Sequence, residues 1–281
     1  MPEADRRSIF KVGFSEIPTT RSLNGIGVKR PTTGRYSVGS DHSQVQQPPF
    51  TLSEVKYMNM LTGLKRHSPP PKFRYIDQFA HGNSLAILDI GCGNNSPSLT
   101  KQYFPTCTYD GVDIQEYNLN AADHEQMDRF FPVTSEGDGY HAIPEKAYDV
   151  VIASHVFEHM RRPNPIIMAL CGKLRTGGLF YSAFPSERSL SLPSAVGTLH
   201  FSDDRTHVFV PSIREVANIM LAQGLTILYG GCPTYGLARQ LAARIAAPMQ
   251  ALRASLFGKK PNARFVWPYY QFESCVVGIL P

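Results

Sequence analysis

Long apolar runs are missing from this chain of 281 residues. No stretch reaches the roughly 20 apolar residues that a membrane-spanning helix needs. The first ten residues, MPEADRRSIF, also lack the apolar core of a secretion signal. We therefore expect a protein that neither spans a membrane nor is secreted, and we expect to find it in the cytoplasm.

Cysteine and clustered positive charge are also scarce. The five cysteines are odd in number and widely spaced, and no CxxC pair occurs among them. This pattern argues against a zinc ribbon and indicates a reducing compartment. The formal net charge is +5, but the basic residues are scattered. Because a nucleic-acid surface normally carries clustered Lys and Arg with interleaved aromatic residues, a nucleic-acid partner is disfavoured.

Composition divides the chain into an arm and one folded domain. Residues 1–49 are rich in Ser, Thr, Pro, Gly and charge, which predicts a mobile arm or, alternatively, a lid that orders over a bound ligand. Residues 50–281 have the composition of a globular domain. Its first predicted helix covers residues 52–65, because Thr51 and Glu54 have the spacing of a capping box.

Strand and helix patterns alternate through the predicted domain. Apolar runs predict strands at 85–90, 108–114, 130–134, 148–154, 179–184, 225–229 and 273–280. Helices are predicted at 73–79, after the Ser96-Pro97 cap, and at 120–128, 163–174 and 212–223. This alternation indicates an α/β fold in which helices cover both faces of a mostly parallel sheet.

A tight turn joins the first strand to its helix, which is where an open parallel sheet binds ligands. Gly91 and Gly93 permit a sharp bend and a close approach to the backbone. Asp113 ends the next strand, where a carboxylate can accept hydrogen bonds from the ribose hydroxyls of an adenosine. A dinucleotide fingerprint requires a glycine where this chain has Ser96, so adenosine without a pyrophosphate fits better.

Four ordered segments carry a resemblance to a known family: ILDIGCGNN, GVDI, YDVVIASHVFEH and LRTGGLFYSAFP. Over about residues 85–229 the chain resembles the class I S-adenosylmethionine-dependent methyltransferase superfamily. The resemblance implies a Rossmann-like, seven-stranded sheet whose last strand is antiparallel. It also implies S-adenosylmethionine as the cofactor.

The same resemblance implies roles for individual residues. Asp89 would lie near the methionine ammonium group, with Gly91, Cys92 and Gly93 passing beneath the cofactor. Asp113 would hold the ribose and Ile114 would lie against the adenine. Thr134 and Asp138 are both candidates for the adenine amino group, and Asp138 is preferred. Ser154 and His155 end the fourth strand, where cofactor and acceptor meet in this family.

Polar side chains after the fourth and fifth strands are candidates for the chemistry on the acceptor. His155, Glu158 and His159 form an HxxEH cluster that we expect at the start of a helix, with all three side chains on one face. In the insertion 186–211 we predict His207 as a general base and Asp204 as its orienting partner, with His159 as a further catalytic candidate.

Each of these interpretations has a structural alternative. The Glu158-His159 pair is common in the superfamily as a helix start that only hydrogen-bonds its surroundings, and the loop could be a salt-bridged structural element. The imidazoles and the carboxylate could also assemble a metal site. Because a family-typical ending of the fourth strand already explains three of them, we expect no metal.

A helical insertion at 232–268 precedes the last strand. Its apolar residues recur at helical spacing beside basic ones, and Pro248 is expected to kink or split the helix. Residues 237–260 could contact an anionic membrane surface peripherally, or they could cover the acceptor pocket or a subunit partner. The oligomeric state is left open.

These observations favour transfer of a methyl group from S-adenosylmethionine to oxygen on a small-molecule, sugar or glycan-related acceptor. Methylation of RNA, with the basic insertion as a docking surface, is the second hypothesis. A non-catalytic module that binds the cofactor is the third.

Overall fold

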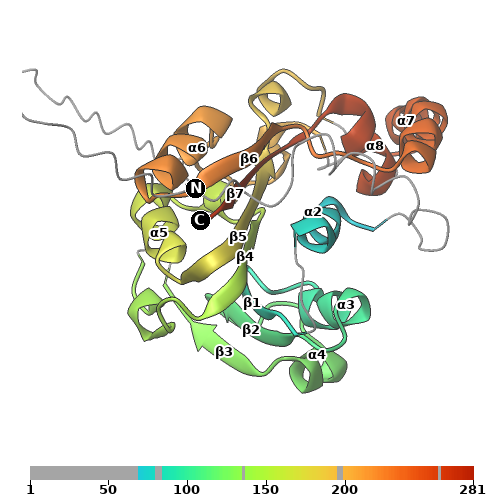
Figure 1. The fold of residues 1–281 in the computed structure, drawn as a ribbon. Coiled ribbons are helices and arrows are strands. Elements are labelled where there is room, and N and C mark those ends of the chain that lie inside the picture. Colours follow the sequence, from blue (N-terminus) through green and yellow to red (C-terminus); the bar gives the residue numbers. More distant parts are fainter. Residues whose placement is uncertain (1–68, 80–83, 135–136, 195–198, 259–260) are drawn as a thin grey trace, which may run out of the picture. The chain divides into compact units, whose positions relative to one another are not determined.

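The computed structural model describes residues 69–79, 84–134, 137–194, 199–258 and 261–281. The predicted arm 1–49 and the predicted helix 52–65 lie outside these ranges. Figure 1 shows helices and strands alternating along the described chain. The strands are β1 (Ala86–Ile90), β2 (Thr108–Asp113), β3 (Arg129–Pro132), β4 (Tyr148–Ser154), β5 (Leu174–Pro185), β6 (Thr226–Gly231) and β7 (Glu273–Ile279). The α-helices are α2 (Pro71–Phe79), α3 (Ser96–Tyr103), α4 (Ala121–Gln126), α5 (Pro163–Cys171), α6 (Ile213–Ala222), α7 (Leu237–Phe257) and α8 (Ala263–Tyr270).

The seven strands form one sheet in the order β3-β2-β1-β4-β5-β7-β6. Strand β7 runs antiparallel to both of its neighbours, and the other six strands are parallel to one another. The predicted seven-stranded, mostly parallel α/β sheet with an antiparallel last strand is therefore confirmed. The strand order reverses between β1 and β4, and such a switch point is where this type of sheet binds ligands.

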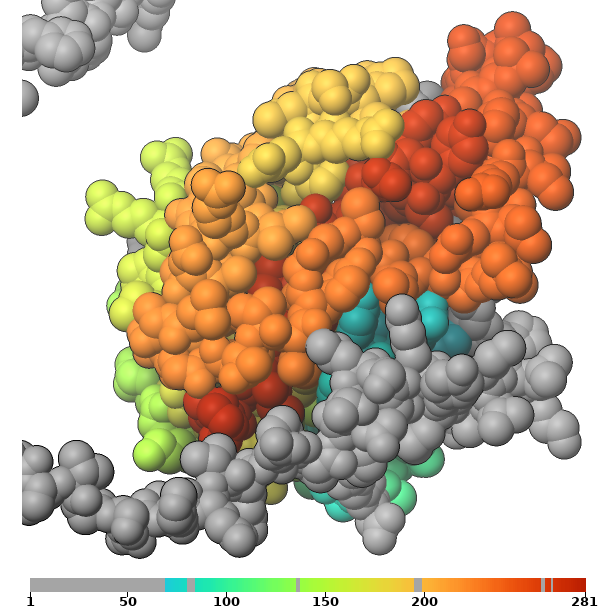
Figure 2. Space-filling model, turned by 45° about the horizontal axis from the view of Figure 1, so that its top comes forward, coloured from blue at the N-terminus to red at the C-terminus, as the bar shows by residue number. Residues whose placement is uncertain are grey.

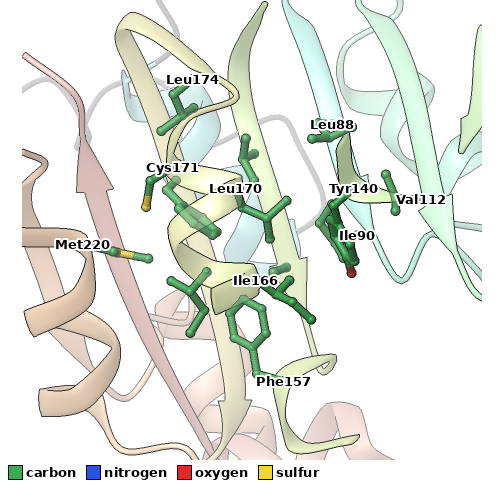
Figure 3. Packing of buried hydrophobic residues seen from close by; sticks show 14 of the residues in the cluster. Leu88, Ile90, Val112, Tyr140, Phe157, Ile166, Leu170, Cys171, Leu174 and Met220 are labelled. Atoms are coloured by element: carbon green, nitrogen blue, oxygen red, sulfur yellow. The ribbon is translucent and has the colours of Figure 1, made fainter. Parts of the chain in front are cut away.

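Alternating side chains give the sheet two buried faces. Leu88 of β1 packs with α5 and α6, whereas its neighbour Ile87 packs with α2 on the opposite face. This alternation explains why the strand sequences are apolar almost throughout, since both faces are covered. Figure 3 shows Ile166 and Leu170 of α5 lying against the sheet on the first of these faces.

Helix α5 ends earlier than the sequence pattern predicts. The sequence favours a helix through residue 174, but Leu174 already pairs with Tyr148 in the sheet. The buried Lys173 explains the change, because its ammonium group donates to the Ile143 carbonyl at 2.8 Å. Its own carbonyl accepts from the amides of Ala147 and Tyr148, so the chain leaves the helix to join β4.

One further local prediction is wrong, and another is wrong in part. Ser96 does not cap α3: the cap is Asn95, and the Ser96 hydroxyl donates to Asp89 at 2.6 Å instead. Pro248 does not split its helix, because α7 runs through it as one helix of 21 residues, and the alternative of a kink stays a prediction. A proline inside a helix removes one backbone hydrogen bond but does not always end the helix.

The insertion after β5 packs against the helical insertion before β7. Leu192 and Leu199 form a small buried cluster with Val266 and Phe272, and Trp267 packs against it. Figure 2 shows the loop after β5, in yellow, beside α8, in red. Of the helices formed by described residues, none combines the length and apolar composition that crossing a bilayer requires.

Candidate active site

The bend after β1 is held against β2 and against the segment that follows β4. The amide of Gly91 donates to the Val112 carbonyl at 2.7 Å. Gly91 has a φ of +72°, and a Cβ there would lie 2.6 Å from Val156 Cγ2. A Cβ on Gly93 would lie 2.6 Å from the carbonyl oxygen of Tyr117. Both glycines are therefore needed for the protein's own packing, besides any ligand contact.

Asp113 lies directly beside this bend. Its Oδ2 accepts from the Gly93 amide at 3.3 Å, and its Oδ1 accepts from the Ile114 amide at 2.7 Å. Burial raises the pKa of the Asp113 carboxyl, although these backbone donors act in the opposite direction. The Ile114 side chain is 62% exposed. The end of β2 thus presents a carboxylate beside an accessible apolar side chain, which suits a ribose followed by an adenine.

The predicted residues Asp89 and Cys92 are buried beneath the bend. The Oδ2 of Asp89 accepts hydrogen bonds from Ser96 at 2.6 Å and Tyr109 at 2.8 Å, and Lys72 lies 3.5 Å away. Burial raises the pKa of the Cys92 thiol, which packs in the core on the α2 face. The contact of Asp89 with the methionine ammonium group stays a prediction. Sequence reasoning missed Lys72 and Tyr109, because neither belongs to a motif.

Both candidates for the adenine amino group lie in one turn after β3. The amide of Thr134 donates to the Asp138 carbonyl at 2.9 Å, and the Asp138 amide donates to Thr134 Oγ1 at 3.1 Å. The two residues therefore lie side by side, and this geometry does not distinguish which of them would contact the adenine amino group. The preference for Asp138 stays a prediction.

Strand β4 ends with Ser154, which pairs with Ala183 of β5. His155 follows with a φ of +58°. The next element is the single 3-10 turn Phe157–His159, and not an α-helix that begins at His155. The expected helix start with three side chains on one face is therefore wrong. The left-handed turn at His155 sends its side chain toward β7, whereas His159 lies beside the loop after β5.

His155 lies between two buried carboxylates. Its Nδ1 is 3.1 Å from Glu158 Oε1, and its Nε2 is 3.1 Å from Glu273 Oε1. Burial alone would lower the pKa of His155, but these two hydrogen bonds outweigh burial and raise it to about 10. Both ring nitrogens of His155 are therefore engaged by carboxylates, and the raised pKa favours the charged form, which does not suit a general base. Sequence reasoning missed Glu273, which belongs to the last strand.

His159 and His207 meet where the turn after β4 contacts the loop after β5. Their ring centroids are 4.9 Å apart. The loop is fixed there by the amides of Val208 and Phe209, which both donate to the Glu158 carbonyl, at 2.9 and 3.2 Å. The structure therefore joins the two predicted catalytic histidines, which are far apart in the sequence.

Asp204 acts on this pair mainly through Thr206. Its Oδ1 accepts from the Thr206 hydroxyl at 2.6 Å, and that oxygen is 2.9 Å from His159 Nδ1. Asp204 Oδ2 lies 3.8 Å from His207 Nε2, whereas His207 Nδ1 donates to the Phe201 carbonyl at 2.8 Å. The group that orients His207 is therefore a backbone carbonyl, and the expected role of Asp204 toward His207 stays a prediction.

Comparison with known proteins places the chain in a family. The family model described as "Methyltransferase domain" matches residues 64–229, which is more than half of the chain. A ubiquinone biosynthesis O-methyltransferase of Burkholderia thailandensis is 26% identical over 168 residues, covering 57% of this chain and 72% of that protein. The corresponding protein of Burkholderia vietnamiensis is 27% identical over the same shares.

One solved structure shows the same fold. In the complex of the Trm112 methyltransferase activator of Haloferax volcanii with a methyltransferase, the similarity covers 70% of this chain and 83% of that chain, at 16% identity and a TM-score of 0.50. Together with the family match and with the carboxylate that the structure places beside the glycine bend, these similarities identify the chain. It belongs to the class I S-adenosylmethionine-dependent methyltransferase superfamily, and S-adenosylmethionine is its cofactor.

Proposed function

We propose that this methyltransferase transfers the methyl group to an oxygen atom of a small-molecule acceptor. The observation that carries the proposal is the pairing of His159 with His207 next to the end of β4. Val156, in the same short segment, packs against the glycine bend where we place the cofactor. His159 follows Val156 by three residues, so we expect the histidine pair to lie close to the bound methyl donor. An acceptor hydroxyl would have to bind there for the methyl group to reach it.

The reaction requires one displacement and the removal of one proton. The acceptor oxygen forms a bond to the methyl carbon while the bond between that carbon and sulfur breaks. The electron pair of the broken bond stays on sulfur, which gives S-adenosylhomocysteine. The hydroxyl proton passes to an imidazole nitrogen of the pair and then to water. His207 is the favoured base, because its Nδ1 donates to the Phe201 carbonyl, which leaves Nε2 as the nitrogen that would take the proton.

The acceptor class is the finer part of the proposal. The relatives are named as O-methyltransferases of ubiquinone biosynthesis, which supports oxygen as the atom methylated. The expectation of a sugar or glycan acceptor depends on the polar loop after β5. Much of that polarity is used within the loop, since Asp203 accepts from the amides of Leu199 and His200. We therefore favour a compact hydroxyl compound over a glycan.

The test is a panel assay with purified protein and methyl-labelled S-adenosylmethionine. Phenols, simple sugars, amines and RNA are offered separately, and the label is followed into product. We expect transfer to a hydroxyl compound, a large loss of rate in His207→Ala, and an unchanged rate in His124→Ala, whose side chain lies on α4. Methylation confined to amines, or to RNA with steep salt dependence of binding, would contradict the proposal.

A second proposal concerns the surface of α7, for which we infer contact with an anionic membrane. Seven large apolar side chains along this helix are between 51% and 72% exposed: Leu237, Leu241, Ile245, Met249, Leu252, Leu256 and Phe257. The helix also contains three arginines and no acidic residue. An apolar stripe edged only by positive charge matches a surface of anionic lipid headgroups.

Vesicle sedimentation tests this contact. We expect binding to vesicles that contain phosphatidylglycerol, weaker binding to pure phosphatidylcholine, and loss of binding in the double variant Leu241→Glu/Ile245→Glu. Leu221→Glu is the matched control, because Leu221 is 53% exposed on the separate helix α6. If the double variant instead changes only the molar mass in light scattering, the stripe is an interface between copies of the chain.

A further inference from the structure

A carboxylate and two imidazoles converge at the acceptor side of the site. Glu158, His159 and His207 each offer one ligand atom, and these atoms lie within 4.8 Å of one another. Two of the residues are adjacent in the turn after β4, and the third comes from the loop after β5. The backbone hydrogen bonds from the loop to the Glu158 carbonyl hold the two segments together.

The carboxylate of Glu158 is only half satisfied. The residue is fully buried, and its Oε1 is bonded to His155. Its Oε2 is buried as well and has no hydrogen-bond partner among the described residues. Buried carboxylate oxygens almost always have a partner, because leaving one without a partner is energetically costly. The unpaired oxygen therefore indicates a ligand beside it.

Hydrogen bonds engage Nδ1 of both imidazoles, which leaves Nε2 of each ring as the nitrogen that can bind a metal ion. For His207, Nδ1 must be the protonated nitrogen, because its partner is a carbonyl that can only accept. For His159 the argument goes through Thr206, whose single hydroxyl proton is donated to Asp204. That hydroxyl oxygen can then only accept from His159 Nδ1. Metal-bound histidines are typically oriented in this way by partners on their second nitrogen.

We propose that Glu158, His159 and His207 bind a divalent first-row transition-metal ion. Two imidazoles and one carboxylate form a donor set typical of catalytic Zn²⁺ and of non-haem Fe²⁺, and it leaves coordination positions open. In the tetrahedral geometry typical of Zn²⁺, ligand atoms about 2.1 Å from the ion stand roughly 3.4 Å apart, so ligand atoms that are now up to 4.8 Å apart must close in by about an ångström when the ion binds.

The surrounding charges favour a cation. Groups linked to the cluster by hydrogen bonds include two further carboxylates: Asp204 through Thr206 and Glu273 through His155. With Glu158 itself, three carboxylates therefore belong to or adjoin the cluster. A divalent ion would reduce this excess of negative charge and would complete the coordination of Glu158 Oε2.

The ion would act on the acceptor, and this role rests on the proposed function, whereas metal binding does not. At an open position the ion would polarise an acceptor hydroxyl and lower its pKa, so that the proton leaves to water. With Nε2 of His207 bound to metal, the imidazole would position the ion and would not itself take the proton. Dependence of turnover on the ion distinguishes the two routes.

The test measures metal binding directly on the full-length protein after treatment with a chelator. Zn²⁺ is titrated by calorimetry, and Co²⁺ is added to follow its visible d–d bands. We expect one ion per chain. His159→Ala and Glu158→Gln should abolish saturable binding, and Thr206→Val should weaken binding by about 10- to 100-fold as an outer-shell change. His124→Ala, which alters an exposed histidine on α4, should bind as the unaltered protein does.

Circular dichroism shows whether each variant is folded. If the buried change Glu158→Gln unfolds the protein, Thr206→Val still tests the site, because its side chain is on the surface. Absence of binding, or binding that survives in both His159→Ala and Thr206→Val, overturns the proposal. S-adenosylmethionine is titrated into the same metal-free samples. Cofactor binding without metal binding overturns the metal site alone, whereas metal binding without methyl transfer to any hydroxyl overturns the proposed function alone.

Discussion

Replacing Gly91 by alanine would place a methyl group inside the bend that follows β1. Gly91 has a φ of +72°, and its new Cβ would lie 2.6 Å from Val156 Cγ2. A left-handed backbone costs an L-residue about 1–2 kcal/mol, and forcing a methyl group into packed atoms costs about 1–3 kcal/mol. We therefore expect Gly91→Ala to lower the free energy of unfolding by about 2–5 kcal/mol.

Gly177→Ala separates the two contributions. Gly177 has a similar φ of +80°, but no atom lies within 4 Å of where its Cβ would be. Only the backbone cost of about 1–2 kcal/mol is expected there. The double variant Gly91→Ala/Val156→Ala should be more stable than the sum of the two single changes predicts, because the shortened side chain makes room for the new methyl group.

Urea unfolding followed by circular dichroism measures these differences, and calorimetric titration of S-adenosylmethionine reports on the bend itself. We expect Gly91→Ala to weaken cofactor binding and Gly177→Ala to leave it unchanged. Equal losses of stability in the two glycine variants, or strict additivity with Val156→Ala, would refute the reasoning. The bend would then not be set by its packing against the segment after β4.

Four further outcomes are expected. Asp113→Asn should weaken S-adenosylmethionine binding by about 10- to 150-fold in calorimetry, since hydrogen bonds to a charged group contribute about 1.5–3 kcal/mol. Because burial raises the pKa of Asp113, cofactor affinity should fall as the pH drops through a range above that of an ordinary aspartate, and Asp113→Asn should lack this decline. Glu273→Ala should lower the free energy of unfolding by about 3 kcal/mol, because His155 loses one of its two carboxylate partners; unaltered urea denaturation would count against that network. His207→Ala should reduce turnover by about 100-fold while cofactor affinity stays the same, and an unaffected rate would reduce the residue to a structural role.

Much of the fold could be predicted from local sequence patterns. Apolar runs such as residues 85–90 and 148–154 locate strands that are buried on both faces, and the Ser212 cap marks the start of α6. Errors arose where side chains formed bonds across the structure that spacing does not reveal. Lys173 draws the chain out of α5 toward Ile143, and Ser96 bonds to Asp89 instead of capping its own helix.

For the site too, some residues could be predicted from the sequence and others could not. The glycine bend and Asp113 were predictable, because a motif and a strand end place them together. The partners of His155 were not, since Glu273 belongs to an antiparallel strand more than 100 residues later in the chain. The HxxEH spacing suggested one helical face, but the left-handed backbone at His155 separates its side chain from that of His159. No spacing rule contains that information.

The central claim is that the bend after β1 and the carboxylate at the end of β2 bind the cofactor together. Calorimetric titration of S-adenosylmethionine into the unaltered protein, Asp113→Ala and the exposed control Asp77→Ala tests it most directly. We expect one binding site per chain, a loss of affinity of about tenfold or more in Asp113→Ala, and no change in Asp77→Ala. Equal affinity in all three proteins would contradict the claim.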